Sequence, residues 1–530
     1  SGLSDRGTLN ISPDDFNPEK VQIDEDSGVF DFEFPEVNVG DVLGDVTGVV
    51  SYGFGNFEIL PTEDFTGNIK SSELPPDVSS LVGDDDSLTV ASYNVLNLDP
   101  IVEDQAKTNN GEARNVDDDL GNGRFDAIAA QIVNNLNSPD IIGLQEVQDN
   151  TGGEIVDDVT SASETLQLLI DKIVAAGGPE YEFVDNPFIT DEASGGQPGG
   201  NIRTAFLYNP DRVDLVADSV QTIGGQGAGE AFEGARLPLV ADFEFNGETV
   251  TVVNNHFSSK GGSAPILGVE QPFDQRQEDV SVNGSLDERQ AQSQAVQDFV
   301  NGLADDANVV VVGDFNEFEF VSPVEELATN SGLTNLTHTL PADERYSFIF
   351  QGNSQALDHI LVSENLAADA EFDIVHVNSE FAETDSRASD HDPLLTRLTF
   401  AAPVNVIDAG TAGRDRLTGT DGNDRMIGSQ GRDQITTGGG NDVIVYTSIV
   451  EAGDIITDIA VGSDQIDLSE VLTSLGYDGN DAFADGYLGF SNRNADTVLT
   501  LDADGTAGSA QARSFLLAQD AVLTASDIVV

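Results

Sequence analysis

The sequence contains no cysteine and no tryptophan, and it has a single methionine among 530 residues. Without cysteine the chain can form neither disulfides nor thiolate metal sites. No apolar run reaches the roughly 18 to 20 residues that span a bilayer, so we expect no stable membrane insertion. The opening SGLSDRG has neither an initiator methionine nor the apolar centre of a signal peptide, so we expect the native start to lie elsewhere.

Basic residues are also scarce, because 22 lysines and arginines stand against 95 aspartates and glutamates, for a formal net charge of -73. The acids are spread along the whole chain, which favours an acidic folded surface over a disordered acidic tail. Such a surface repels itself at low ionic strength and is screened by salt. We therefore expect a salty, halophilic or marine habitat and stability drawn from bound ions, above all calcium.

The composition, 39% apolar over 530 residues, predicts several domains. Residues 1–70 read as a small all-β module, 71–86 as a linker rich in proline, serine and aspartate, and 87–400 as an α and β domain. Apolar spacing predicts helices near 125–136 and 291–303. Buried strands are predicted at 88–93, 140–144, 203–208, 250–255, 308–312 and 359–363. A linker at 401–409, a repeat at 410–446 and an extension at 447–530 follow.

Polar residues follow the predicted buried strands. The runs LTVASY, DIIGL, VTVVNN and NVVVV lead into Asn94, Glu146, His256, and Asp314 with Asn316. Open sheets place their sites at the carboxyl ends of strands. Two further motifs contribute: SDHDPL holds Asp390 and His391, and LDHILVS holds Asp358.

Each of these residues alone has a plainer interpretation. Asn94 suits a turn, Glu146 an exposed strand-end acid, and GDFN a turn between strand and helix. Only five histidines occur in the chain, however, and two of them stand beside aspartate or asparagine in such motifs. His338 and His376 lack comparable surroundings, and we expect them to be structural or solvent-exposed.

Six motifs occur in a fixed order over about 300 residues: YNVLNL, LQEV, NNHFSSKG, GDFN, LDHILVS and SDHDPL. This order resembles the endonuclease/exonuclease/phosphatase superfamily, which includes DNase I, exonuclease III and neutral sphingomyelinases. The chain is similar in particular to large bacterial extracellular nucleases. The resemblance implies an α+β fold, a four-layer sandwich of two packed β-sheets flanked by helices.

The resemblance also implies a cation site. It makes Asn94, Glu146 and Asp390 the metal residues, and hard oxygen ligands suit Mg²⁺ or Mn²⁺. Asp314 and Asn316 would position the attacking water or a second metal. These types fit the chemistry, because in-line attack on a phosphodiester builds charge on the phosphoryl oxygens and on the leaving alkoxide.

Two histidines complete the implied constellation. His391, held by Asp358, matches the family's catalytic histidine beside the water. His256 matches the histidine that faces the leaving group and the non-bridging oxygens. A carboxylate that fixes the tautomer suits histidine to either role at neutral pH, and Asp185 is the candidate partner for His256.

Three cations stand beside these motifs, namely Arg203, Lys260 and Arg289. A chain with so few basic residues should place some of them where a phosphate binds. The alternative for each is an ordinary surface ion pair with a neighbouring acid.

A nine-residue repeat follows the α and β domain. Glycine recurs at 413, 422, 431 and 440, and each glycine is followed two places later by Asp415, Asp424, Asp433 or Asp442. The pattern GGxGxDxUx is that of the RTX calcium-binding nonapeptide, with Thr437 in place of one glycine. It predicts a calcium β-roll in which the aspartates supply hard oxygen ligands. A flexible glycine/aspartate linker is the alternative.

The two ends of the chain carry weaker signals. DIITDIAVGSDQIDLSEVL and the final ASDIVV resemble the C-terminal regions of proteins exported by type I secretion machinery. VNVGDVLGDVTGVVSYGFGNFEILPT resembles the OB-like module that precedes the catalytic domain in large bacterial nucleases. OB-folds often bind oligonucleotides, but the expected basic groove is missing, which leaves a structural or docking role open.

These observations predict a secreted, extracellular, metal-dependent phosphodiesterase that hydrolyses nucleic acid, with DNA as the expected polymer. One alternative is a phosphatase or another phosphoesterase on the same fold. The other is a non-enzymatic surface or adhesion protein, which would require lost catalytic residues, and every residue that can be matched is present. DNA versus RNA, endo versus exo cleavage and the oligomeric state stay open.

Overall fold

The computed structural model describes residues 3–530 apart from 25–33, 54, 115, 273–274, 305, 385–386, 401–404, 409, 421, 478, 480, 494 and 508–509. The chain forms two compact units, Ser1–Phe400 and Ala401–Val530. Most of the predicted linker at 401–409 lies outside the described residues. No helix in the described part of the chain is long and apolar enough to cross a membrane.

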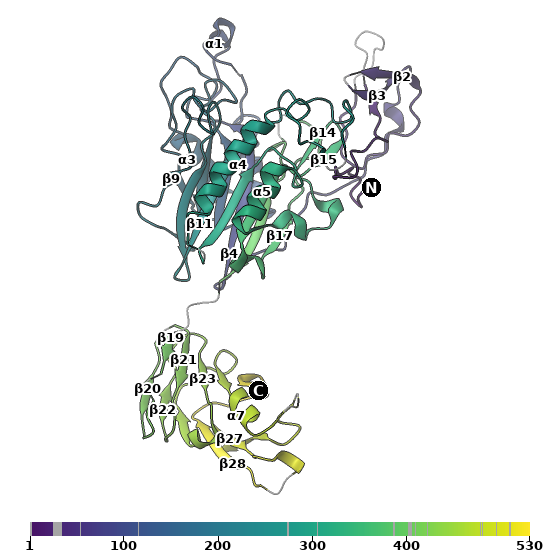
Figure 1. The fold of residues 1–530 in the computed structure, drawn as a ribbon. Helices are drawn as coiled ribbons and strands as arrows, with labels where there is room; N and C mark the ends of the chain where they lie inside the picture. Colours follow the sequence, from purple (N-terminus) through teal and green to yellow (C-terminus); the bar gives the residue numbers. More distant parts are fainter. Residues whose placement is uncertain are drawn as a thin grey trace. The chain divides into compact units, whose positions relative to one another are not determined.

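Two large β-sheets form the centre of the first unit (Figure 1). The six-stranded sheet has the order β17 (Glu371–Ile374), β18 (Leu394–Thr399), β4 (Ser87–Leu98), β5 (Ile141–Val147), β7 (Arg203–Tyr208) and β6 (Glu182–Val184). The second sheet has the order β13 (Leu333–Asn335), β16 (Asp358–Ser363), β12 (Asn308–Asp314), β11 (Glu248–His256), β10 (Leu239–Phe245) and β8 (Asp214–Leu215), with β9 (Gln221–Thr222) also on β10. Each predicted buried strand falls in one of these strands.

The two sheets pack face to face because their central strands are apolar on both sides. In β4, Leu88 and Val90 belong to the core between the sheets, whereas Ala91 and Tyr93 belong to the core under the helices. This alternation follows from the two-residue period of a strand. Polar contacts through Asn254 join the sheets inside this core: the Gln145 side chain donates to its oxygen at 2.7 Å, and its amide donates to the carbonyls of Leu144 and Ala205 at 3.0 and 2.9 Å.

Helices cover the outer faces. Residues of α2 (Arg124–Asn134) and α3 (Ser163–Ala175) share a core with the six-stranded sheet. Residues of α4 (Leu286–Val300) and α5 (Ser322–Ser331) share a core with the second sheet, and they lie in front of it in Figure 1. The fold is thus mixed α and β, with the helices outside two stacked sheets. The second predicted helix begins earlier than expected, at Leu286 rather than at 291.

Short elements complete this unit. They are α1 (Gln105–Asn110), α6 (Glu364–Ala367) and the hairpin of β14 (Phe348–Phe350) and β15 (Asn353–Gln355). Residues 71–86, the predicted linker, contain no regular helix or strand among the described residues and run along the first unit, where the Asp77 N–H donates to the His376 carbonyl at 3.0 Å.

The N-terminal segment forms a small sheet in the order β1 (Gln22–Ile23), β3 (Asn56–Pro61) and β2 (Gly48–Gly53). The Arg6 guanidinium ties the segment to the rest of the unit through ion pairs with Asp77 and Glu380, at 2.8 and 2.5 Å. Part of the predicted OB-like module, including residues 25–33 and 54, lies outside the described residues. The OB-like assignment stays a prediction.

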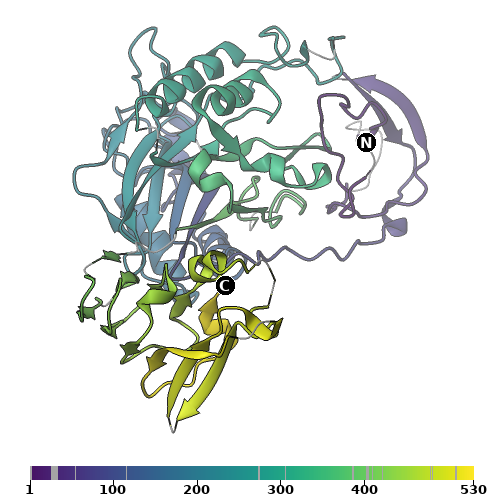
Figure 2. The same cartoon turned by 60° about the horizontal axis from the view of Figure 1, so that its bottom comes forward.

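In the second unit, successive strands of the repeat alternate between two sheets of mainly parallel strands. One sheet contains β19 (Asn405–Ile407), β21 (Asp424–Ile427), β23 (Val443–Val445), β25 (Gln465–Asp467) and β29 (Ile528–Val529). The other contains β20 (Arg416–Thr418), β22 (Gln434–Thr436), β24 (Asp454–Ile456), β28 (Arg513–Ala518), β27 (Asp496–Leu501) and β26 (Leu488–Arg493). The longer strands near the C-terminus are yellow in Figure 2.

The repeat and the C-terminal extension share one core. The inward aliphatic residues of the repeat, Leu417, Met426, Ile435 and Ile444, pack with residues of the extension such as Leu516. α7 (Ser469–Ser474) adds Val471 and Leu472 to the same core. Residues 447–530 therefore extend both sheets of the repeat instead of forming a separate body.

Candidate active site

Cross-strand register places three of the predicted site residues side by side. His256 ends β11 opposite Asp314 at the end of the parallel strand β12, and Asp314 lies opposite Asp358 at the start of the antiparallel strand β16. Close strand approach requires glycine at 313, because a Cβ there would lie 2.0 Å from the Asn255 carbonyl oxygen. The sequence therefore delivers an imidazole and two carboxylates to one sheet edge.

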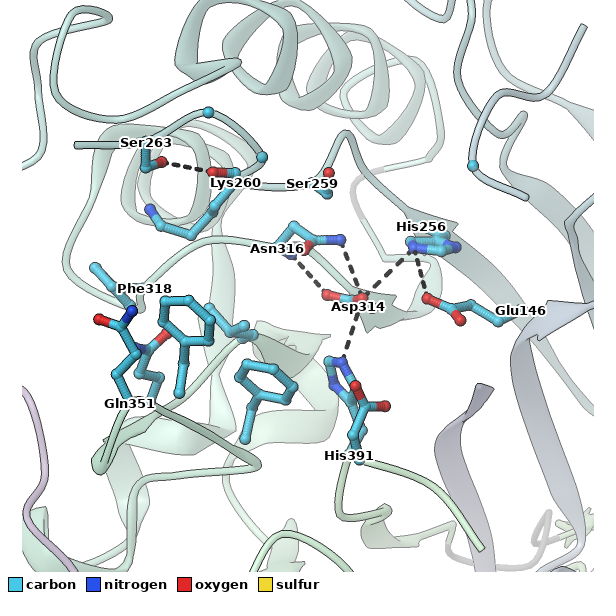
Figure 3. Close-up of a pocket in the computed structure, with 18 of the residues that line it drawn as sticks. Glu146, His256, Ser259, Lys260, Ser263, Asp314, Asn316, Phe318, Gln351 and His391 are labelled. Atoms are coloured by element: carbon cyan, nitrogen blue, oxygen red, sulfur yellow. Dashed lines mark hydrogen bonds and ion pairs between the residues drawn. The ribbon is translucent and has the colours of Figure 1, made fainter. Parts of the chain in front are cut away.

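The carboxylate of Asp314 is the centre of the site (Figure 3). Its Oδ2 lies 3.5 Å from Nε2 of His256 and 4.0 Å from Nε2 of His391. Asn316 fixes this carboxylate, donating from its backbone N–H at 2.8 Å and from its side-chain amide at 3.0 Å. Asn316 has a φ of 50°, a left-handed conformation that asparagine tolerates better than most residues.

His391 is oriented by a carboxylate, as the motifs predicted. Its Nδ1 donates to Oδ2 of Asp358 at 2.6 Å, and the Ser347 hydroxyl donates to the same oxygen at 2.6 Å. The loop that carries His391 is tied to β4, because the Ser389 hydroxyl donates to the Asn94 carbonyl at 2.7 Å. Nε2 of His391 is left facing Asp314 and the cleft.

The predicted metal residues meet at the end of β4 and β5. The Asn94 amide donates to Glu146 at 3.1 Å and to Asp314 at 3.2 Å, and the Asn97 N–H donates to Glu146 at 3.1 Å. Glu146 has a φ of 60°, an uncommon value for this residue type that is typical of functional positions. Asp390 is half-buried and lines the same cleft.

Burial shapes the electrostatics of the site. Burial and the charge of Asp390 raise the pKa of Glu146, and burial raises the pKa of Asp314 to about 7 although His391 opposes the shift. Burial lowers the pKa of His256 well below its ordinary value. Burial also lowers the pKa of His391, but Asp358 and Asp314 outweigh this and raise it well above its ordinary value. The two histidines are therefore held in opposite protonation states near neutral pH.

The donor set fits a divalent cation. One ligand atom each from Glu146, His256 and Asp314 lies within 4.8 Å of the others, and Asp358 and His391 form a second such group with Asp314. Burial raises the pKa of Glu146 and of Asp314, and neighbouring carboxylates add to both shifts, so a bound cation would favour the charged forms. Glu146 could hold the ion with a carboxylate oxygen, Asp390 lines the same cleft, and the Asn94 amide stands beside Glu146.

A cleft of about 790 Å³ opens from this cluster. Aromatic residues also line it: Phe348 packs at 4.8 Å from the His391 ring, Phe350 is 55% exposed, and Phe318 lies under the Lys260 ammonium at 4.3 Å. The β14–β15 hairpin supplies two of these rings. The cleft therefore joins an acidic cluster to an apolar, aromatic wall.

Of the three predicted phosphate-binding cations, only Lys260 reaches the cleft. Arg203 is 0% exposed and pairs with Asp185 at 3.0 Å. Arg289 is also 0% exposed and pairs with Glu317 at 3.0 Å. These two guanidinium groups form buried ion pairs inside the protein. The expectation that Arg203 and Arg289 contact phosphate was therefore wrong. The Lys260 ammonium also pairs with Glu317, at 2.6 Å.

Two further expectations concern histidines. Asp185 pairs with Arg203 rather than with His256, and Nδ1 of His256 has no hydrogen-bond partner among the described residues, which corrects the proposed orientation. His376 is structural, because it is buried between Asp392 at 3.1 Å and Glu344 at 3.6 Å. His338 is exposed.

Arg236 is a site residue that the motifs did not reveal. Its guanidinium is buried at the cleft wall, donates to the Phe257 carbonyl, and has an Nε without a hydrogen-bond partner in the described part of the chain. Its positive charge interacts with the carboxylates of Glu146 and Asp314 and helps to lower the pKa of His256. Its only sequence signal was a lone basic residue before an apolar strand in an acidic chain.

The repeat aspartates form two ladders. Asp433 accepts from the Asp415 N–H and Asp442 accepts from the Asp424 N–H, each at 2.8 Å across 18 residues. The extension continues both ladders, because Asp454 accepts from the Asp433 N–H at 2.8 Å and Asp464 accepts from the Asp442 N–H at 3.0 Å. The nine-residue count could not reveal these two, since their spacings are 21 and 22 residues.

The ladders fit calcium. Oδ2 of Asp433 and Oδ2 of Asp442 are buried without a hydrogen-bond partner among the described residues. Burial and the neighbouring carboxylates Asp464, Asp424 and Asp458 raise the pKa of Asp442 to about 6. Buried oxygens that lack partners and repel each other are suitable ligands for a hard cation.

Comparison with known families assigns the chain. The Endonuclease/Exonuclease/phosphatase family profile matches residues 91–391, more than half of the chain, and the chain belongs to this family. The RTX calcium-binding nonapeptide repeat (4 copies) matches residues 409–444. Residues 1–71 match a domain of unknown function (DUF8508). No curated protein matches the chain.

Several solved structures are similar to parts of the chain. A humanized D. rerio TDP2 with 14 mutations is 18% identical, with a TM-score of 0.38 over 59% of this chain and 99% of that one. D. rerio TDP2 complexed with single strand DNA product is 17% identical, with a TM-score of 0.37 over 59% and 99%. Mannosyl-6-phosphatase from Bacteroides thetaiotaomicron is 16% identical, with a TM-score of 0.35 over 59% and 100%.

Proposed function

We propose that this protein is a secreted, metal-dependent nuclease that hydrolyses phosphodiester bonds of extracellular nucleic acid, DNA above all. The observation that carries the proposal is the convergence of Asp314, His391 and Glu146 in an acidic part of a cleft that aromatic rings also line. A phosphate monoester of a small molecule needs only the acidic part. A nucleic acid uses both, because a base stacks on an aromatic ring while its phosphate enters the cluster.

The residues divide the work of an in-line attack. Asp314, whose pKa of about 7 matches neutral pH, accepts the proton of the attacking water, and Asn316 fixes its carboxylate. His391 stays protonated through Asp358 and donates from Nε2 to the phosphoryl oxygens. His256 is neutral and donates a hydrogen bond toward a non-bridging oxygen or the leaving oxygen.

Glu146 and Asp390, beside Asn94, are the proposed ligands of Mg²⁺ or Mn²⁺. When bound, such an ion neutralises charge on the phosphoryl oxygens and on the departing alkoxide. Arg236 adds a fixed positive charge on the wall of the cleft. Together with Lys260, it offsets part of the repulsion between a polyanion and an acidic protein.

Few cations line the cleft, so we infer that stacking supplies much of the substrate binding. Phe350 is 55% exposed and Phe348 packs against His391, which places an apolar surface beside the reacting groups. Stacking of one base on an aromatic ring contributes about 1–3 kcal/mol and tolerates any base. This mode weakens less with salt than phosphate contacts do, which suits a chain with a net charge of -73.

The other parts of the chain receive matching roles. The repeat binds Ca²⁺ as a β-roll, and the C-terminal residues carry the signal for type I secretion. The N-terminal residues form an OB-like module that docks on the catalytic domain, as the Arg6 ion pairs support. We place the domain limits at 1–70, 87–400 and 410–530.

One set of assays tests the substrate. Supercoiled plasmid, single-stranded DNA, RNA, nitrophenyl phosphate and bis-nitrophenyl phosphate are incubated with the full chain in EDTA, Mg²⁺ or Mn²⁺. We expect metal-dependent cleavage of plasmid and of the diester. A faster rate on nitrophenyl phosphate than on both diesters would assign the site to a phosphatase, and no turnover of any substrate would favour the adhesion alternative.

A further inference from the structure

A second acidic cluster lies outside the catalytic cleft, in the loop that follows β4. One carboxylate oxygen each from Asp99, Asp117 and Asp119 lies within 4.8 Å of the others. Asp99 and Asp119 are 0% and 1% exposed. Glu103, 2% exposed, joins them by accepting from the backbone N–H groups of Gly153 at 2.7 Å and Asp117 at 3.5 Å.

The two carboxylate oxygens of Asp99 differ in their hydrogen bonding. Its Oδ1 accepts from the Ile101 N–H at 3.0 Å, whereas its Oδ2 is buried and has no hydrogen-bond partner in the described part of the chain. Gly152 closes the cluster from another side, because a Cβ there would lie 2.6 Å from Oε1 of Glu103 and 2.8 Å from Cγ of Asp99. A buried carboxylate oxygen without a partner is costly, so a ligand is expected.

Positive charge is also deficient in this loop. Arg124 pairs with Asp119, but Asp99 and Glu103 have no cationic partner among the described residues. Burial, with the charges of Glu103 and Asp119, raises the pKa of Asp99 to about 8. Burial raises the pKa of Asp119 to about 6, even though Arg124 opposes the shift. Among the described residues, Asp99 and Glu103 therefore lie next to other acids without a cation to neutralise them.

We propose that Asp99, Glu103, Asp117 and Asp119 bind a structural calcium ion, separate from the catalytic cation and from the repeat. Oxygens within 4.8 Å of one another can all touch one ion, because calcium–oxygen distances are about 2.3–2.6 Å. Calcium accepts six to eight oxygens in irregular geometry, which suits an acid-rich loop. Mg²⁺ prefers near-ideal octahedral sites and keeps its waters.

The site would stabilise the segment that supports the catalytic carboxylate. Asp119 accepts from the Asp99 N–H at 3.2 Å, and its partner Arg124 donates to the carbonyls of Val95 and Leu96. The next residue, Asn97, donates to Glu146. A bound calcium ion therefore fixes the loop at residues 99–119 and, through this chain of contacts, the end of β4.

Peptide-resolved hydrogen exchange on the full chain tests the site. Exchange is measured in EDTA and across a calcium titration, with residues 409–444 as an internal reference for calcium binding by the repeat. Calcium should slow exchange in residues 99–119 and at Gly153. At a hundredfold excess over Kd the opening constant of a bound loop falls about a hundredfold.

Two variants make the test decisive. Asp99→Asn removes the charge but keeps the shape, so in EDTA its loop should exchange no faster than the wild-type loop, and calcium should no longer slow it. Asp118→Asn is the matched control, because that neighbouring side chain accepts from Gly121 at 2.6 Å and is not in the cluster; its calcium response should be retained. A wild-type loop that ignores calcium while the repeat responds, or a full response in Asp99→Asn, would overturn the proposal.

Discussion

Oδ2 of Asp358 lies 2.6 Å from Nδ1 of His391, and Asp358 is also the cross-strand partner of Asp314. The Asp358 carboxylate thus orients the His391 imidazole. The strand register also places Asp358 beside Asp314, the proposed proton acceptor. The arrangement predicts that His391→Ala lowers the rate of plasmid cleavage roughly 10² to 10⁴-fold without changing the melting temperature greatly. Asp358→Asn should lower kcat more than it raises KM.

The matched control for this prediction is His338→Ala, because His338 is exposed and outside the cleft lining. Its turnover should equal that of the wild type. Near-normal turnover in His391→Ala would exclude the assigned role for this histidine. Similar losses for His256→Ala and Asp314→Ala are expected, since both groups face the same reacting phosphate.

Glu146→Gln tests the catalytic cation. The substitution removes a carboxylate that Asn94 and Asn97 hold in place. We expect the Mg²⁺ concentration that gives half-maximal activity to rise and the maximal rate to fall roughly 10² to 10⁴-fold, while the catalytic unit stays folded. Asp126→Asn, an exposed acid paired with Lys172 on a helix surface, is the control. Equal Mg²⁺ curves for the Glu146 variant and the wild type would refute the ligand assignment.

Arg236→Ala tests the residue that the motifs missed. Loss of a charged hydrogen-bond donor in a buried wall should lower kcat/KM about 10 to 150-fold, the equivalent of about 1.5–3 kcal/mol. Arg212→Ala removes an arginine paired with Asp140 outside the cleft and should leave kcat/KM unchanged. If both variants behave alike in steady-state kinetics, Arg236 has no special place in the site.

The repeat should respond to pH and to calcium in linked ways. The pKa of Asp442 in the folded chain is raised to about 6, above its value in an unfolded chain, so its ionisation opposes folding. In EDTA this contribution to the stability of the C-terminal unit should therefore be full below about pH 3.8 and be lost as the pH rises from there through about 6. Saturating calcium should remove this loss and raise the melting temperature at pH 7.5.

Calorimetry of the full chain, in EDTA and in calcium at several pH values, measures this linkage. Asp442→Asn should lessen the loss of stability between about pH 4 and pH 6 in EDTA and reduce the shift in melting temperature caused by calcium. A C-terminal transition that is indifferent to calcium at pH 7.5 would contradict the calcium-binding role of the ladders.

His376 gives the first unit a pH dependence of the same sign but at higher pH. Although burial lowers its pKa, hydrogen bonds to Asp392 and Glu344 raise it to about 9. A histidine with a raised pKa contributes stability that is full below the unfolded value near 6.5 and is lost as the pH rises through 9. The contribution of the protonated His376 to the free energy of unfolding should therefore fall by about 3 kcal/mol as the pH rises from 6.5 to about 9. Denaturant unfolding of the wild type and of His376→Gln is measured across pH 6–10 at constant calcium. The difference between their free energies of unfolding should shrink as the pH rises through about 9.

Much of the site was predictable because its chemistry follows strand ends. Asn94, Glu146, His256 and Asp314 each follow an apolar run, and parallel strands bring such ends to one sheet edge. The pair of His391 and Asp358 followed from the motifs and is confirmed by the 2.6 Å contact. The Endonuclease/Exonuclease/phosphatase and RTX assignments are confirmed by the family matches.

What failed depended on side-chain contacts between distant segments. Arg203 and Arg289 stand beside catalytic motifs in the sequence, but the partners that bury them, Asp185 and Glu317, are set by tertiary packing. Arg236 was missed because a single arginine before a strand carries no periodic signal. Asp454 and Asp464 were missed because their ladder steps are 21 and 22 residues and not the 18 of two nonapeptides.

The 18-residue step of the aspartate ladders limits the lengths by which the repeat can grow or shrink. Consecutive repeats occupy opposite sheets, so losing nine residues would send every later strand to the wrong sheet and pair each aspartate with the wrong ladder. Losing eighteen would leave both ladders in phase. Natural variants of this tail should therefore differ by pairs of repeats, and the coil of two repeats, not the single nonapeptide, is the unit that duplication can copy.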